Sequence, residues 1–167
     1  ILFNPLKGGT ILVNMPFPNF KKPSHILATW FGVGLLRPAP GTWGSLMAAI
    51  GWYFLDFLHS WTIIIIPLFV ILSLYVCIRA DEDSETDDHP SIVIDEVVGM
   101  LIALSFVEND FLMYIAAFIL FRLFDIWKPG PIAWADINLK GGWGILFDDV
   151  LAGLFSGVII FVFFSLI

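Results

Sequence analysis

An uncharged apolar run of 18 residues, WTIIIIPLFVILSLYVCI, occupies positions 61–78. A second run of 18 residues, VLAGLFSGVIIFVFFSLI, occupies positions 150–167. At about 1.5 Å per residue, a helix of this length is about 27 Å long, close to the roughly 30 Å hydrocarbon thickness of a bilayer. The two runs therefore predict helices that cross a membrane.

The composition of the whole chain agrees with this prediction. The 167 residues are 59% apolar and 14% charged, with a mean hydropathy of +0.91, whereas soluble domains are about 45–50% apolar and about 25% charged. A soluble globule of this size could not bury so much apolar surface. The formal charge of -7 and only eight Lys and Arg residues argue against nucleic-acid binding. A single cysteine, Cys77, excludes an intrachain disulfide and offers no metal-ligand spacing.

Three shorter apolar segments, Leu46–Leu58, Ile92–Val107 and Phe111–Trp127, predict further membrane helices. The stretch His25–Leu36 is too short to cross and contains two glycines, so it predicts an interfacial or re-entrant helix. We therefore expect an all-α, polytopic membrane helical bundle with about five membrane segments plus this short N-terminal helix. The bundle would form a single membrane-embedded domain over residues 25–167, preceded by an N-terminal cytoplasmic segment, residues 1–24.

The distribution of basic residues predicts an orientation for this bundle. The connections His59–Ser60 and Glu108–Asp110 contain no Lys or Arg, whereas the N-terminal segment and the other connections contain seven. Cytoplasmic loops of membrane proteins carry an excess of Lys and Arg. The N-terminus and the loops Arg37–Ser45, Arg79–Ser91 and Lys128–Gly144 are therefore expected on the cytoplasmic side.

Six ionisable residues interrupt the apolar segments near the cytoplasmic ends of three predicted helices. They are Asp95 and Glu96, Arg122 and Asp125, and Asp148 and Asp149. Ionisable groups are costly within a membrane, so they usually mark a functional site. Small residues at four-residue spacing follow Asp95 and Asp149, which predicts that both carboxylates face the bundle interior.

Structural roles could also explain some of these residues. We expect Asp95, Glu96, Asp148 and Asp149 in the first turns of their helices, where carboxylates cap free amide groups. Asp125 lies near a predicted helix C-terminus, where the helix dipole disfavours an anion. Capping therefore does not explain Asp125.

Carboxylates that converge in a low-dielectric site repel one another unless a cation compensates them. Mg2+ prefers carboxylate oxygens together with the phosphate oxygens of a substrate. The side chains of Arg122, Lys128 and Lys140 could balance the remaining charge of that phosphate. The pattern therefore predicts metal-assisted hydrolysis at phosphorus.

Two further features lie on the same side of the predicted bundle. Residues 40–45, PGTWGS, read as a glycine-rich loop that could bind an anion through backbone amides and the hydroxyls of Thr42 and Ser45. His89 precedes the third segment and could shuttle a proton near neutral pH.

Two other functions fit part of this pattern. Intramembrane carboxylates also line ion pathways, so the chain could be a small divalent-cation transporter or channel subunit. That function requires charges through the whole membrane depth, and the outer halves of the segments contain almost none. A phosphatidyltransferase would also hold metal with membrane aspartates, but its Asp-Gly-x2-Ala-Arg signature is absent.

Four separated blocks of sequence carry a resemblance to a known family. They are PGTWGS (40–45), DHPSIVIDEVVGM (88–100), FRLFDIWKP (121–129) and GGWGILFDDVLAG (141–153). In this order and at these spacings the chain resembles the phosphatidylglycerophosphatase A family of bacterial membrane phosphatases, over roughly His25 to Gly157. Pro90 departs from the family pattern, which has glycine after the histidine in some members.

The resemblance implies Mg2+-dependent hydrolysis of phosphatidylglycerophosphate to phosphatidylglycerol and phosphate, in the bacterial cell inner membrane. The orientation predicted from the basic residues places the active site on the cytoplasmic side. The resemblance implies a phospholipid substrate, and we infer no obligatory protein partner. Spacing does not distinguish an activated water from an aspartate as the nucleophile, and we favour water. The implied metal ligands are Asp95, Glu96, Asp125, Asp148 and Asp149. The expected catalytic residues are Asp95, Glu96, Asp125, Asp149 and His89. The expected substrate-binding residues are Thr42, Ser45, Arg122, Lys128 and Lys140.

Overall fold

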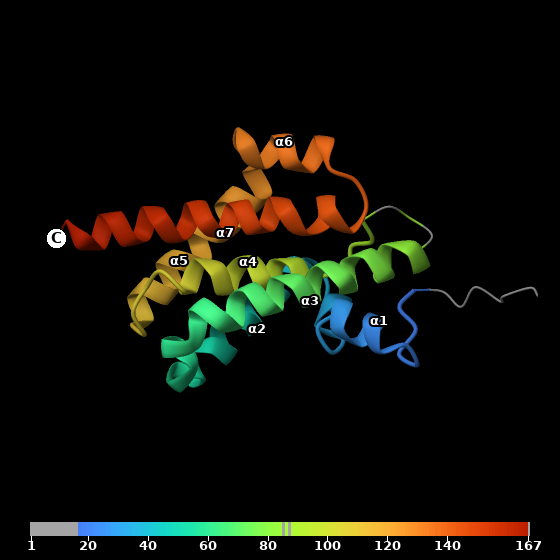
Figure 1. Ribbon diagram of the computed structural model, residues 1–167, viewed down its shortest axis with the longest axis horizontal. Coiled ribbons are helices and arrows are strands. Elements are labelled where there is room, and N and C mark those ends of the chain that lie inside the picture. The colour runs from blue at the N-terminus through green and yellow to red at the C-terminus, as the bar shows by residue number, and fades with distance from the viewer. Residues whose placement is uncertain (1–16, 85, 87, 167) are drawn as a thin grey trace, which may run out of the picture.

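The computed structural model describes residues 17–84, 86 and 88–166, and within them it contains helices and no strand, which confirms the all-α prediction (Figure 1). Most of the predicted N-terminal segment, residues 1–24, lies outside the described residues. The α-helices are α1 (Pro23–Ala28), α2 (Pro40–Phe54), α3 (Thr62–Asp83), α4 (Ile94–Leu104), α5 (Phe111–Trp127), α6 (Pro131–Asn138) and α7 (Gly142–Ser165). Two 3-10 helices, η1 (Val33–Leu35) and η2 (Asp56–Trp61), precede α2 and α3 respectively.

Helix α4 is the centre of the bundle, and α2, α3, α5 and α7 pack around it. Nine of its eleven residues are buried. A helix that is apolar on every side belongs inside a protein core or a membrane. The segment Ile92–Val107 is therefore apolar largely because it contacts other helices of the same chain.

Glycines bring α4 and α7 together. A Cβ atom at Gly99 would lie 2.6 Å from the backbone oxygen of Asp149, and a Cβ atom at Gly153 would collide with the backbone oxygen of Gly99. Small residues at such positions let two helix backbones approach closely. Asp95 and Asp149 lie one turn away from these glycines and are only 5% and 3% exposed, which confirms that both face the bundle interior.

Two helices of the described residues are long and apolar enough to cross a membrane, namely the continuous segment Phe57–Asp83 and α7. The first lies on the outside of the bundle, with Ile63, Leu68 and Ile71 largely exposed. Helices α2, α4 and α5 have 15, 11 and 17 residues, so they fall short of the roughly 18 to 20 residues that a perpendicular crossing needs. The prediction of about five membrane segments is therefore supported for two of the five. The apolar runs at α2 and α4 extend into turns and connections beyond these helices, whereas α5 covers its whole run.

Three local predictions are wrong in ways that affect the site. Residues 40–45 are the first turns of α2 and not a loop, because Pro40 occupies the first helical position. Helix α7 begins at Gly142, so Asp148 and Asp149 lie in its second turn and not its first. The connection 128–144 contains α6, which also begins with a proline.

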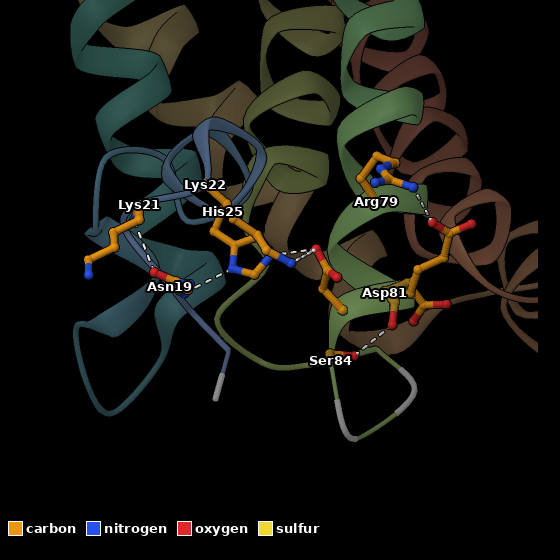
Figure 2. Close-up of polar contacts among 9 residues, drawn as sticks. Asn19, Lys21, Lys22, His25, Arg79, Asp81 and Ser84 are labelled. Carbon is orange, nitrogen blue, oxygen red and sulfur yellow. Dashed lines mark hydrogen bonds and ion pairs between the residues drawn. The ribbon is translucent and has the colours of Figure 1, made fainter. Parts of the chain in front are cut away.

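The predicted helix His25–Leu36 is interrupted, because Trp30, Phe31 and Gly32, with φ values of 44°, 56° and 93°, are left-handed and separate α1 from η1. Helix α1 is fixed to the end of α3 by polar contacts around the buried His25 (Figure 2). The backbone N–H of Asn19 donates to His25 Nδ1 at 2.8 Å, so Nε2 carries the proton and donates to Asp83 at 3.0 Å. Lys22 pairs with the same carboxylate at 2.8 Å.

Candidate functional site

A polar cavity of about 280 Å³ lies where α4 and α7 begin and α5 ends. Its charged lining consists of six carboxylates and two cations, a formal charge of -4 when all are ionised. These residues are Asp88, Asp95, Glu96, Asp125, Asp148, Asp149, Arg122 and Lys128. The three pairs of ionisable residues singled out in the sequence therefore line one cavity.

Three of the carboxylates form a tight group, which we call the acidic cluster: Asp95, Glu96 and Asp149. One oxygen from each lies within 4.8 Å of the others. Asp95 and Glu96 open α4, and the glycine contact between α4 and α7 brings Asp149 to them. One oxygen of each carboxylate is buried and has no hydrogen-bond partner among the described residues.

Arg122 and Asp125 form an ion pair one turn apart on α5, with Nη1 and Oδ2 separated by 2.5 Å. The same guanidinium nitrogen donates to the hydroxyl of Ser45 on α2 at 3.3 Å. The Nε atom of Arg122 is buried without a hydrogen-bond partner in the described part of the chain. Arg122 therefore retains one unused N–H donor.

Lys128 follows the last residue of α5 in a left-handed conformation, with a φ of 47°. Its ammonium donates to Asp148 at 2.6 Å and also to Asp136 on α6. Partial burial lowers the pKa of this ammonium, but the hydrogen bonds to the two carboxylates outweigh burial and raise the pKa above its ordinary value. Lys128 is therefore charged at physiological pH and has a third N–H available.

Four of the predicted site residues lie elsewhere or act indirectly. Ser45 is buried in α2 and donates to the carbonyl of Gly41, while Thr42 is half-buried and is not part of the cavity lining. Lys140 lines a second polar pocket of about 340 Å³, which shares Asp88, Ile145 and Asp148 with the cavity.

His89 is also outside the cavity lining, although both of its chain neighbours belong to it. Its ring packs 4.9 Å from that of Phe17, and its Nδ1 accepts a hydrogen bond from the backbone of Ser91 at 3.2 Å. Burial and the nearby charge of Arg37 lower the pKa of His89. The histidine is therefore predominantly neutral at pH 7.

The sequence analysis missed three residues of this region. Asp88 lines the cavity, Asp136 binds Lys128, and Gly41 leaves room for Glu96, whose carboxylate a Cβ atom at position 41 would strike. The proline at the start of α6 could have indicated a helix carrying Asp136. No local pattern indicates the contact between Gly41 and Glu96, which depends on how α2 and α4 pack.

The acidic cluster fits a hard divalent cation. Three carboxylates supply oxygen ligands, and unpartnered buried oxygens are the atoms that a cation would satisfy. Without a cation, three carboxylates this close repel one another strongly. The donor set therefore suits Mg2+ or a similar ion.

The family model and two relatives that match this chain carry the same name. The family model described as phosphatidylglycerophosphatase A matches residues 26–164. The chain is 42% identical to phosphatidylglycerophosphatase A of Escherichia coli over 142 residues, which are 83% of this chain and 82% of the relative. It is 42% identical to the phosphatidylglycerophosphatase A of Haemophilus influenzae, over 95% of this chain and 93% of the relative.

A third relative carries a different name. The chain is 40% identical, over 84% of its length and 94% of the relative, to a Bacteroides thetaiotaomicron protein provisionally named a phosphatidylinositol-3-phosphatase. No solved structure matches the chain significantly.

Proposed function

The chain belongs to the phosphatidylglycerophosphatase A family, and we propose that it uses Mg2+ bound at the acidic cluster to remove the terminal phosphate of phosphatidylglycerophosphate. It is a phosphoric monoester hydrolase, and its product in phospholipid synthesis is phosphatidylglycerol. The observation that carries the metal proposal is the cluster of Asp95, Glu96 and Asp149, with one oxygen from each within 4.8 Å of the others.

The charge of the cavity supports a role for a cation. A lining with six carboxylates and two cations would repel a phosphate dianion. A bound divalent ion would supply Lewis-acid stabilisation of the phosphoryl oxygens and orient the attacking water. We propose Asp125 and Asp148 as supporting residues, because each already pairs with a cationic side chain.

The two cations are suited to hold the phosphate. Arg122 has an unused Nε–H, and Lys128 has one N–H beyond those given to Asp136 and Asp148. Asp125 and Asp148 pair with these cations within the same cavity. This arrangement would fix a phosphoryl group between the metal and two donors, and a carboxylate of the cavity would accept the proton of the attacking water.

The exposed apolar surface supports a multi-pass location in the bacterial inner membrane. Trp127 at the end of α5, Trp134 on α6 and Trp143 at the start of α7 are exposed, as expected for residues at a membrane interface. We propose that the end of the bundle that carries the cavity faces the cytoplasm, with the shorter helices partly in the bilayer. The cavity then lies at headgroup depth, so the phosphate reaches it while the acyl chains stay in lipid.

The alternative of a divalent-cation transporter is less well supported. The described structure has its polar cavities at one end of the bundle, whereas the two large pockets toward the other end are lined by uncharged residues. A conduction path would need polar groups across the whole depth.

Phosphate release from defined lipids tests the proposal. Purified protein in vesicles should hydrolyse phosphatidylglycerophosphate in the presence of Mg2+ and should lose this activity with a chelator or with Asp95→Asn. Phosphatidylinositol 3-phosphate should be a poorer substrate, and Glu108→Gln, at the far end of the bundle, is the matched control. Undiminished turnover by Asp95→Asn would remove the acidic cluster from the reaction, and preference for the inositol lipid would overturn the substrate assignment.

A further inference from the structure

An apolar groove of about 460 Å³ runs between α2 and α5 on the side of the bundle that faces outward. Its floor contains the buried Ala49 and Tyr114, and its rims contain Ile50 and Ile115, which are 43% and 40% exposed. At the end remote from the cavity, the rings of Tyr53 and Tyr114 meet edge to face at 5.5 Å.

The groove and the phosphate cavity share no lining residue, but they follow one another along both helices. On α2 the groove's lining residues Leu46, Ala49, Ile50 and Tyr53 form a stripe at helical spacing. Ser45 directly precedes this stripe, and Gly41, five residues before Leu46, lines the cavity. On α5 the stripe through Ile115 and Phe118 continues four residues later to Arg122.

The two helices are joined where the groove meets the cavity. Arg122, which lines the cavity, donates to the Ser45 hydroxyl across the gap between α5 and α2. The boundary is therefore marked by Arg122, which lines the cavity, and by its buried partner Ser45. Just beyond this pair, the half-buried Leu46 and Phe118 begin the apolar lining.

A second apolar pocket, of about 510 Å³, lies against α3, α4 and α7, but it does not reach the cavity in this way. On α3 and α4 the buried side chains of Cys77 and Val98 lie between its lining and the acidic residues. Both belong to a packed apolar cluster. A substitution in this pocket can therefore serve as a control for substitutions in the groove.

We propose that the groove between α2 and α5 binds one acyl chain of the phospholipid substrate while its phosphate occupies the cavity. The proposal rests on the phosphatase function argued above. The lining of the groove on α2 runs from Leu46 to Phe54, about 12 Å along the helix axis, compared with about 15 Å for the hydrocarbon of one leaflet. The groove therefore has the length to hold most of a chain whose headgroup lies at the start of α2.

The groove would contribute to turnover by positioning the substrate and would add little to its binding free energy. An acyl chain gains little from moving between lipid and an apolar protein surface, because the two environments are similarly apolar. A chain lying along α2 and α5 sets the depth and direction of the headgroup, and a misplacement of about 1 Å at a reacting centre can cost up to about 100-fold in rate. Blocking the groove should therefore lower turnover of the lipid more than turnover of the free headgroup.

Ile50→Trp and Ile115→Trp would fill the groove from either rim, and Ile71→Trp on the outer face of α3 is a matched control at the second pocket. We expect the two groove variants to lower kcat/KM for long-chain phosphatidylglycerophosphate about tenfold or more. Their kcat/KM for the deacylated headgroup should stay within about twofold of the original protein, and their melting temperatures within a few degrees. Ile71→Trp should resemble the original protein. Equal losses on both substrates, or full activity of both groove variants on the lipid, would overturn the proposal.

Photolabelling tests the occupant without relying on turnover. Phosphatidylglycerophosphate and phosphatidylcholine, each with the same photoreactive acyl chain, would be irradiated with the protein in vesicles and the labelled peptides identified by mass spectrometry. The phosphorylated lipid should label residues 46–54 and 111–118 several-fold more than phosphatidylcholine does. Equal labelling by both would show a general lipid contact and contradict the proposal, whereas absence of phosphate release from any lipid by the original protein would instead contradict the phosphatase function.

Discussion

Replacing Asp95 with asparagine keeps the shape of the side chain and removes one charge from the acidic cluster. Two unit charges 4.8 Å apart repel by about 3.5 kcal/mol at an effective dielectric constant of about 20. Asp95 has two such neighbours, Glu96 and Asp149, and the new amide can donate a hydrogen bond to either. Because Arg122 and bound protons offset part of the repulsion, we expect the cation-free variant to gain about 1–3 kcal/mol in free energy of unfolding.

Thermal unfolding in detergent, with chelator or with saturating Mg2+, measures this effect. For a chain of this length, the gain corresponds to a rise of about 2–10 °C in the melting temperature without metal. The original protein should be stabilised by Mg2+, by about 2.7 kcal/mol at 100 times its Kd, and Asp95→Asn should lose most of that stabilisation. Glu108→Gln should change neither value. A variant that melts lower than the original protein in chelator, or that retains the full Mg2+ response, would refute the idea that these carboxylates repel one another and share a cation.

Three further predictions follow from the packing and the charge pairs. Gly153→Ala should destabilise the protein by about 1–3 kcal/mol, because its Cβ atom would collide with the backbone of Gly99. Denaturant or thermal unfolding measures this loss, and an unchanged melting temperature would contradict the close approach of α4 and α7. Lys128→Met should abolish phosphate release and cost about 3–5 kcal/mol of stability, since it leaves the buried Asp148 without its partner. Lys128→Arg should restore most of the stability. A stable, active Lys128→Met protein would exclude the role given to this cation. Protonation of His89 should disfavour the folded state as the pH falls below about 6.5, because the lowered pKa of His89 makes its protonation less favourable in the folded than in the unfolded chain. The free energy of unfolding of His89→Gln, measured relative to the original protein, should therefore rise as the pH falls, with turnover largely intact, and a collapse of turnover would restore the histidine to the reaction.

The positions of the charged residues could be predicted because membrane segments tolerate so few of them. Asp95 and Asp149 each precede a series of small residues at four-residue spacing, and this pattern correctly indicates that both face a neighbouring helix. Arg122 and Asp125 lie three residues apart on one helix, so their proximity also follows from the sequence alone.

The number of crossings could not be predicted in the same way, because an apolar segment has the same composition whether lipid or protein surrounds it. Helix α4 is apolar and yet is enclosed by its neighbours. Residues 40–45 illustrate a second limit, since proline and glycine are common both in anion-binding loops and at the start of a helix. The bond from Arg122 to Ser45 joins residues 77 positions apart and depends on the packing of α2 against α5, which no local pattern reports.

The central claim is that a divalent cation at Asp95, Glu96 and Asp149 contacts the phosphate of the substrate. Electron paramagnetic resonance of Mn2+, bound in place of Mg2+ together with a non-hydrolysable phosphonate analogue of the substrate, measures this contact through the coupling of the ion to the phosphorus nucleus. We predict a bound Mn2+ signal with phosphorus coupling that is lost in Asp95→Asn, Glu96→Gln and Asp149→Asn. Mn2+ binding that survives all three substitutions, or a bound ion without phosphorus coupling, would contradict the claim.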